Sequence, residues 1–388
     1  MGPSRFRASF AWSPEQPTGR DACDNGPVIS RRTFLVSASL LVAGAGCRNG
    51  SSTSVETFSS GYLGSPDQTM EDHLLVSARG GELPAAAVST FQSRSHVTVT
   101  SQDPGTDGSL LLRLAAGGYG EVDIALVGSE ALSYLVTSNQ VEPIDKKLVP
   151  AMARLQPPFT DPAADPGLDH SVPATYDIVG IVLQDGVVLE ALTWAGFFRL
   201  AERRPGRVVV PDSADDVIGA VLVSLGHAWD SDSSGDLDDA SARLEELFPS
   251  LRVLGRRVPS QVLASQHSPL ASLRRAREFR RVRRGRFLVP RDGSALEVRS
   301  YCIPVYAPHP VAAHGWLQNW LDPVVEAGAM TQLRTPVPLE QARAYVQPDV
   351  LADQTICPPT VALDASIQPD ISADGQARRD QIWQELTA

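Results

Sequence analysis

Strand-type and helix-type segments alternate along this chain from about residue 71 onward. The apolar, β-rich run at 74–77 is followed by a glycine turn, a helical segment over 84–92 and a second β-rich run. A helix that ends at a glycine then precedes a buried strand over 122–127, and Ser129 begins another helix. This alternation predicts an α/β fold with a mostly parallel sheet and helices on both faces.

A second set of strand and helix segments follows the first. An extended segment leads into a buried strand over 178–183, and "GRVVVPDSADDVIGAVLVSLG" has the pattern strand, turn, helix. Asp212 and Ser213 in this turn are typical helix caps. Asp215 and Asp216 suit a first helical turn, because they face its free N–H groups. The second set therefore predicts a second lobe.

The segment "ISRRTFLVSASLLVAGAGC", residues 29–47, indicates export. Its apolar run of about a dozen residues is too short for the roughly 20 that span a bilayer. The order "SRRTFLV" resembles the twin-arginine export signal, so residues 1–46 are interpreted as a signal that is removed. Residues 47–70 are rich in Ser, Gly and Thr, which predicts a flexible tether.

The small residues before Cys47 resemble a lipoprotein cleavage site, at which Cys47 carries the lipid. Gly44 departs from that pattern, because such sites usually have leucine there. The alternative is an ordinary signal-peptidase site with an incidental cysteine. The expected location is extracytoplasmic, with export by the twin-arginine route and a lipid anchor in the outer face of the cytoplasmic membrane.

The net charge of the 388 residues is -11, which argues against a general nucleic-acid binder. The sequence contains no GxSxG, no HExxH and no phosphate-binding loop, and its seven histidines are scattered. We therefore expect no enzymatic activity, no cofactor and no metal site.

Four cysteines occur in the chain. Cys23 lies in the predicted signal and Cys47 at the predicted cleavage site, which leaves Cys302 and Cys357 as an even pair in an oxidising compartment. A disulfide between the two is one interpretation, and two free buried thiols is the other.

Several segments together resemble the extracytoplasmic solute-binding proteins of ABC transporters, specifically the spermidine/putrescine-binding (polyamine) branch. They are "LLVSARGGELPAAAVSTFQSRSHVTVT", "LAAGGYGEVDIALVGSEALSYLVTSNQVEPID", "HSVPATYDIVGIVL", "VVVPDSADDVIGAVLVSLGH" and "WLQNWLDPVVEAGAM". The resemblance implies a type II periplasmic-binding-protein fold, in which two lobes with mixed sheets are joined by a hinge. It assigns residues 71–180 to lobe 1, 181–305 to lobe 2, and 306–388 to the return to lobe 1 and C-terminal helices.

The resemblance also implies the partners and the site. The partners are a small-molecule solute, an ABC permease and its ATPase, and the protein acts as a monomer. The implied ligand-binding residues are Arg79, Glu82, Ser129, Tyr176, Ser213, Asp216 and Arg299. Arg79 and Arg299 stand where polyamine binders carry aromatic or acidic residues. Because arginine suits carboxylate and phosphate, these substitutions indicate an anionic or zwitterionic solute rather than a polyamine.

Structural interpretations compete at several of these positions. Arg299 could face solvent from a strand, Tyr176 could belong to the core, and Asp216 could serve only as a charge at a helix N-terminus. Glu82 could simply begin a helix. The sequence leaves these alternatives open.

Two charged runs require interpretation. Asp230–Asp239 resembles a calcium loop, but Ser241 stands where such a loop needs a bidentate Glu, so aspartates capping a helix are favoured. The basic run Arg274–Arg286 is interpreted as a solvated, partly helical face, with an anion-binding or membrane-facing patch as the alternative.

The predicted function is capture of a small solute for delivery to a membrane permease. The alternative is a lipoprotein that keeps this fold without transport and acts as a sensor or as an envelope interaction protein.

Overall fold

The computed structural model describes residues 69–254, 269–282 and 284–387. These described residues belong to one compact unit. The predicted export signal, Cys47 and nearly all of the predicted tether lie outside the described residues. Within the described part, no helix combines the length and the apolar character needed to cross a membrane.

The described strands form a mixed sheet in the order β2-β1-β3-β9-β4-β7-β5-β6, with β8 paired to β4. Parallel pairs join β1 to β2 and β3, and β5 to β6 and β7. The pairs made by β4 and β9 are antiparallel, so the sheet is mixed rather than mostly parallel. The strands are β1 His73–Ser77, β2 Thr98–Gln102, β3 Ile124–Gly128, β4 Ser171–Leu183, β5 Val208–Pro211, β6 Leu251–Leu254, β7 Ala271–Arg275, β8 Arg286–Leu288 and β9 Leu296–Cys302.

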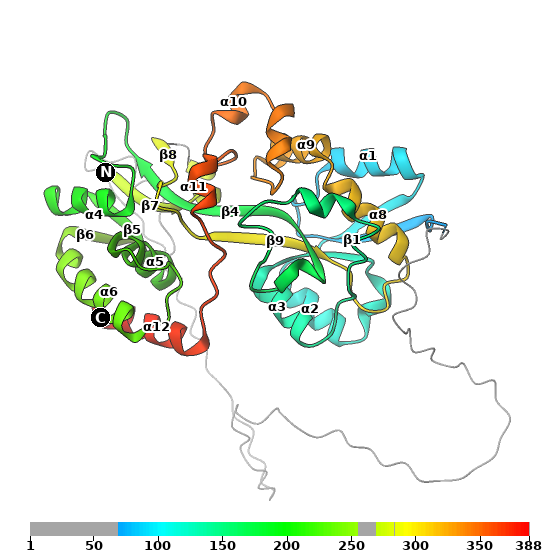
Figure 1. The fold of residues 1–388 in the computed structure, drawn as a ribbon, viewed down its shortest axis with the longest axis horizontal. Helices are drawn as coiled ribbons and strands as arrows, with labels where there is room; N and C mark the ends of the chain where they lie inside the picture. The colour runs from blue at the N-terminus through cyan, green and yellow to red at the C-terminus, as the bar shows by residue number, and fades with distance from the viewer. Residues whose placement is uncertain (1–68, 255–268, 283, 388) are drawn as a thin grey trace, which may run out of the picture. The chain divides into compact units, whose positions relative to one another are not determined.

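Strand β4 joins two halves of this sheet. Its residues 171–178 pair with β9, whereas residues 179–183 pair with β7 and partly with β8. All 13 of its residues are buried. Figure 1 shows β4 in green beside β9 in yellow. The extended segment and the buried strand that the sequence predicts are thus one strand, because β9 supplies the partner for its first part.

We call the first lobe the half of the sheet that contains β2, β1, β3, β9 and residues 171–178, with its helices. Its core includes Trp316 and Trp320 of α8, which pack edge-on against Tyr301 of β9 at ring-centroid distances of 6.0 and 5.2 Å. Helices α8 and α9 pack beside α1 (Figure 1). The helices of this lobe are α1 Ala85–Ser95, α2 Asp107–Ala115, α3 Ser129–Thr137, α8 Pro310–Trp320 and α9 Pro323–Leu333.

We call the second lobe the half that contains residues 179–183, β7, β5, β6 and β8, with its helices. A separate apolar core holds Trp194, Phe197 and Trp229. Its helices are α4 Trp194–Arg203, α5 Ala214–Leu225, α6 Ser234–Leu247 and α12 Ala373–Thr387. The remaining helices are α7 Ala276–Val282, α10 Pro348–Leu351 and α11 Thr360–Asp364.

The chain crosses between the lobes at different points from those that the resemblance implies. Strand β9 falls within residues 181–305, expected in lobe 2, yet it pairs with β3 of the first lobe. Helix α12, at the end of residues 306–388, packs against α5 and α6 of the second lobe. Burial of Ile382 and Trp383 in the second core holds it there.

The acidic run Asp230–Asp239 begins a helix, as the sequence predicts. The cap differs from the expectation, because the hydroxyl of Ser233 rather than an aspartate accepts the N–H of Asp236. No group of three or more His, Cys, Asp or Glu residues placed to hold a metal ion occurs in the part of the chain that the structure describes.

Candidate functional site

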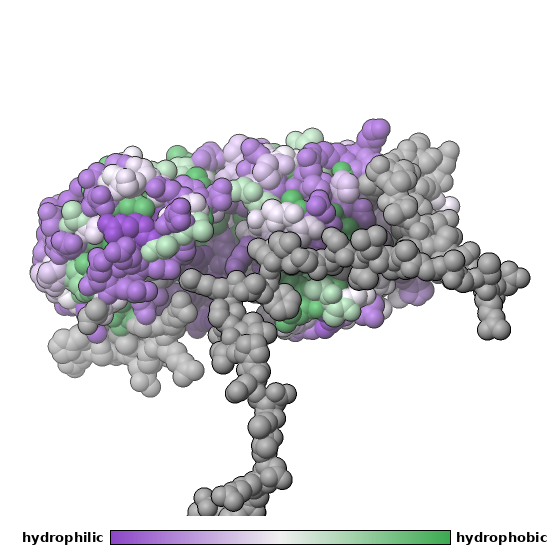
Figure 2. Space-filling model, turned by 90° about the horizontal axis from the view of Figure 1, so that it is seen from below, coloured by the Kyte–Doolittle hydropathy of each residue, from purple (hydrophilic) through white to green (hydrophobic). Residues whose placement is uncertain are grey.

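A cleft of about 930 Å³ lies between first turns of helices from both lobes. The first lobe contributes the starts of α2 and α3, the second lobe contributes the start of α5, and β9 runs along it. These helices follow β2, β3 and β5, so the cleft lies at carboxyl ends of parallel strands, where α/β folds bind ligands. Hydrophilic residues cover most of the face that Figure 2 shows.

In the first lobe, one carboxylate holds two arginines together. The Asp107 carboxylate lies 2.7 Å from Nη2 of Arg79 and 3.2 Å from Nη1 of Arg299, and it also accepts the N–H of Gly128 at 3.0 Å. Glu82 contacts the second arginine at 3.0 Å. Burial raises the pKa of Asp107, but hydrogen bonds and charges from Arg299, Gly128 and Arg79 outweigh it, so the pKa lies below its ordinary value.

In the second lobe, Arg275 joins two carboxylates. Its guanidinium lies 2.7 Å from Asp216 and 3.0 Å from Glu297. Arg277 adds contacts to Glu297 at 2.8 Å and to Asp177 at 3.3 Å. Burial raises the pKa of Asp216, and Arg275 only partly opposes this effect.

Strand β9 connects the two ion-pair clusters. Glu297 and Arg299 are two residues apart, so their side chains leave the same face of the strand, and both line the cleft. Glu297 pairs with arginines of the second lobe, and Arg299 pairs with carboxylates of the first lobe. Strand β9 of the first lobe therefore carries one member of each cluster.

Carboxylates outnumber arginines in the cleft, with six against three among its charged lining residues. All three arginines are ion-paired. Within the described residues, Glu130, Asp215 and Asp370 form no salt bridge. The cleft lining thus carries a surplus of carboxylates, although Asp215 accepts a hydrogen bond from Nε2 of Gln376 at 2.9 Å.

Comparisons with known proteins identify the fold. No family model matches the chain. The spermidine/putrescine-binding periplasmic protein of Escherichia coli is 20% identical over 312 residues, which cover 79% of this chain and 89% of that protein. A spermidine/putrescine ABC transporter substrate-binding protein from Streptococcus pneumoniae superposes with a TM-score of 0.71 at 17% identity, covering 82% of this chain and 99% of that one.

This chain has the fold of the ABC-transporter solute-binding proteins. The resemblance that the sequence predicts is confirmed. A solved GABA receptor shares the fold as well, with a TM-score of 0.59 at 19% identity over 82% of this chain and 97% of that one.

Four of the seven ligand residues implied by the resemblance line the cleft of this solute-binding fold, namely Arg79, Ser129, Asp216 and Arg299. Ser129 begins α3, and its hydroxyl donates to the carbonyl of Val298 at 3.2 Å. Arg299 is largely buried rather than exposed on its strand, since its side chain is 11% exposed.

The other three residues lie elsewhere. Tyr176 belongs to the core of the first lobe, where its ring packs 4.9 Å from that of Phe159, because β4 is buried along its whole length. Ser213 caps α5 by accepting the N–H of Asp216 at 3.4 Å. Glu82 is half-buried behind the cleft wall and contacts Arg299. Tyr176 and Ser213 thus have structural roles that the sequence left open, whereas Glu82 does not begin a helix, because α1 starts at Ala85.

Three further residues that the sequence patterns did not indicate shape the cleft. Asp107 and Glu297 hold the arginines, and Tyr134 of α3, a residue that is 51% exposed, lines the cleft. The Asp107 position could have been found, because Thr106 and Asp107 have the pattern of a helix start directly after a strand. No sequence pattern indicated a role for Glu297, because the arginines that pair with it are distant in the sequence.

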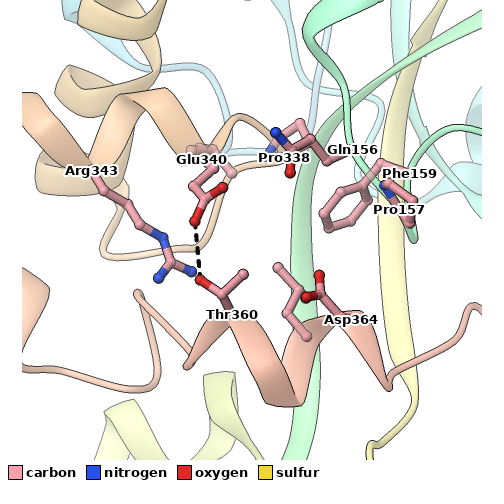
Figure 3. Close-up of a pocket in the computed structure, with 10 residues that line it drawn as sticks. Gln156, Pro157, Phe159, Pro338, Glu340, Arg343, Thr360 and Asp364 are labelled. Atoms are coloured by element: carbon pink, nitrogen blue, oxygen red, sulfur yellow. Dashed lines mark hydrogen bonds between the residues drawn. The ribbon is translucent and has the colours of Figure 1, made fainter.

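A second pocket is too small for a solute. Its volume is about 20 Å³, close to the space that one water needs. Figure 3 shows this small pocket, in which Glu340 is hydrogen-bonded to Thr360. Arg343 and Phe159 also line the pocket. The large cleft is therefore the better candidate for solute binding.

Cys302 and Cys357 are free, buried thiols in the structure. They lie in different apolar clusters, the first beneath α2 and α3 and the second near the wider core of the first lobe. The disulfide that the sequence suggested is therefore wrong, and the alternative of two free thiols holds. Burial raises the pKa of Cys302 to about 12.

The basic run Arg274–Arg286 is not an open patch in its described part. Arg275 and Arg277 bind carboxylates, as described above, and Arg280 donates to the carbonyl of Thr355 at 2.9 Å. Arg286 donates to the carbonyl of Val187, between β4 and α4, at 2.8 Å. Much of this positive charge is thus held by other parts of the fold.

Proposed function

We propose that this protein captures a small amine-bearing solute in the cleft and delivers it to an ABC permease that is driven by its ATPase. The acidic cleft between the two lobes is the observation that carries this proposal. Closure of the lobes around a ligand is the usual motion of this fold, and a solute in the cleft would touch both lobes. The protein itself performs no chemistry in this account.

The charge of the cleft favours an amine. Glu130, Asp215 and Asp370 come from three separate segments and have no salt bridge among the described residues, so each could accept an ammonium group. Tyr134 offers an exposed aromatic face to a cation. The relatives named above for spermidine, putrescine and GABA also take amines, which supports the same class.

A purely anionic solute fits the cleft poorly. Arg79 and Arg299 suggested such a solute in the sequence, but Asp107 already pairs with both of them. Breaking a half-buried ion pair would cost free energy that the solute must recover. We therefore propose a polyamine or an amine-bearing zwitterion, with the ammonium group bound by the carboxylates that form no salt bridge.

A thermal-shift screen tests the solute class, because a ligand that binds only the folded state raises the melting temperature. The panel contains spermidine, putrescine, γ-aminobutyrate, succinate, sulfate and a neutral sugar. We expect a shift with at least one amine and none with succinate or sulfate. The proposal would be contradicted if no amine raised the melting temperature, or if only anions raised it.

We further propose that the protein is exported by the twin-arginine route, acts outside the cytoplasm as a monomer, and is anchored through lipid on Cys47. The sequence of residues 29–47 supports this proposal. A Cys47→Ala protein should leave the membrane fraction, whereas the wild type should stay in it. Retention of the variant would argue against the lipid anchor.

Uptake measurements separate transport from the alternative of a sensor or an envelope interaction protein. Cells that lack the protein should take up the labelled solute found in the screen more slowly than cells that contain it. Equal uptake, together with measurable solute binding, would favour the sensor. The paired arginines of the basic run give that alternative no separate support.

A further inference from the structure

The Asp107 carboxylate is surrounded by donors on several sides. Oδ1 accepts from Nε of Arg79 at 3.1 Å and from Nη2 of Arg299 at 3.2 Å. Oδ2 accepts from Nη1 of Arg299 at 3.2 Å and from the backbone N–H of Gly128 at 3.0 Å, and it lies 2.7 Å from Nη2 of Arg79. The Asp107 side chain is 15% exposed.

The donors around this carboxylate come from different elements. Arg79 follows β1, Arg299 lies on β9, and Gly128 is the residue before α3, so its N–H lies at the N-terminal end of that helix. Two guanidiniums and a backbone N–H at a helix N-terminus are the groups that proteins use to bind carboxylate, sulfate or phosphate. The arrangement is an anion site, and a side chain of the chain itself fills it.

We propose that Asp107 is a specificity-determining residue that fills this anion site and so excludes anionic groups of solutes from the first-lobe side of the cleft. The site lies at the cleft surface, since Arg79, Asp107 and Arg299 all line it. A solute carboxylate that entered there would have to displace Asp107 from both arginines. The acidic surplus that remains in the cleft then selects the ammonium end of a solute.

Glu82 modifies this site without filling it. It contacts Nη2 of Arg299 at 3.0 Å, from a position that is not part of the cleft lining. With Asp107 removed, two guanidiniums and one carboxylate remain, so the vacated position keeps a net positive charge. The role of Asp107 does not depend on the proposed function. Only the preference of the cleft for amines rests on it.

The test is chemical rescue of an Asp107→Ala variant, because formate has the size of the carboxylate that this substitution removes. Binding of formate and sulfate to the full chain is measured by calorimetry and by melting temperature in a low-salt buffer. We expect the variant to bind both anions at least tenfold more tightly than the wild type. A folded variant with no gain in anion affinity would overturn the proposal.

Two controls locate the effect. Asp103→Ala removes an exposed carboxylate whose neighbour is the N–H of Gly105, and it should leave anion affinity unchanged. An Asp107→Ala, Arg79→Gln double variant lacks one guanidinium and should lose most of the gain. An equal gain in the double variant would show that the anions bind elsewhere.

The variant could also be unstable, because it leaves two arginines without their shared carboxylate. In that case formate should raise its melting temperature by several degrees more than it raises that of the wild type. Absence of rescue, both here and in an Asp107→Asn variant, would overturn the proposal. If the wild type binds no amine while Asp107→Ala gains anion binding, the proposed solute class fails and the role of Asp107 stands.

Discussion

The guanidinium of Arg275, at the end of β7, lies 2.7 Å from the carboxylate of Asp216 in the first turn of α5. The Asp216 side chain is 8% exposed. Replacing Arg275 with Met would leave this carboxylate buried without its partner, which we expect to lower the free energy of unfolding by about 3 kcal/mol. Urea unfolding measures the change.

A matched control is Arg203→Met in α4. Arg203 forms an ion pair with Glu190, but both side chains are more than half exposed, so water and salt screen the pair and its loss should cost much less stability than the loss of Arg275. An Arg275→Met, Asp216→Asn double variant should recover part of the lost stability. If Arg275→Met and Arg203→Met cost the same, the buried pair does not hold β7 to α5.

Glu326 of α9 predicts a pH dependence of stability. It is fully buried, and burial raises the pKa of its carboxyl well above the ordinary 4.5, although the N–H of Leu339 partly opposes this effect. Since the folded pKa lies above the unfolded one, the folded state binds the proton more tightly. The stability from this group is therefore present below pH 4.5 and is lost as the pH rises through the folded pKa.

Melting temperatures of wild type and Glu326→Gln between pH 4.5 and 8 measure this effect. The melting temperature of the variant should rise relative to that of the wild type as the pH rises, because an amide has no carboxyl proton to lose. Glu121→Gln, which changes an exposed residue, should run parallel to the wild type. A constant difference between wild type and Glu326→Gln would contradict the assignment.

Two helix glycines should respond oppositely to alanine. A Cβ on Gly219 of α5 would lie 2.2 Å from the indole of Trp229, which lines the cleft, so Gly219→Ala should cost about 2 kcal/mol. A Cβ on Gly328 of α9 would meet only the Cβ of Ala86, at 3.5 Å, so Gly328→Ala should add about 0.5 kcal/mol through helix propensity. Thermal unfolding measures the stability of both variants. Equal changes in melting temperature for Gly219→Ala and Gly328→Ala would contradict this packing.

The thiols of Cys302 and Cys357 should be unreactive in the folded protein and reactive in denaturant. Burial raises the pKa of both thiols, so neither forms a thiolate readily. A Cys23→Ala, Cys47→Ala protein is titrated with a thiol reagent in the absence of reductant. We expect no reactive thiols in buffer and two reactive thiols in guanidinium. Finding none in guanidinium would mean that the two are oxidised.

Much of the fold could be predicted from the sequence, because it follows from local patterns. The helix predicted at Ser129 begins there, and the buried strands over 74–77 and 122–127 correspond to β1 and β3. The full length of β4 could not be predicted, since its first part is a strand only through pairing with β9. The same holds for α12, whose place depends on contacts with α5 and α6.

The site could be predicted only in part, because its charges are paired across long stretches of sequence. Arg299 and Asp107 are 192 residues apart, and Arg275 and Asp216 are 59 apart. The sequence showed the arginines but not the carboxylates that neutralise them. An inference of solute charge from Arg79 and Arg299 alone therefore points to an anion, whereas the assembled cleft has a carboxylate surplus.

The most direct measurement is a calorimetric titration of spermidine, putrescine and γ-aminobutyrate into the wild type and into a variant with Glu130→Gln, Asp215→Asn and Asp370→Asn. We predict that the wild type binds at least one of these amines and that the variant binds it at least tenfold more weakly, a loss of about 1.4 kcal/mol. Equal affinity in the two proteins, or tighter binding of succinate than of any amine by the wild type, would contradict capture of an amine by this cleft.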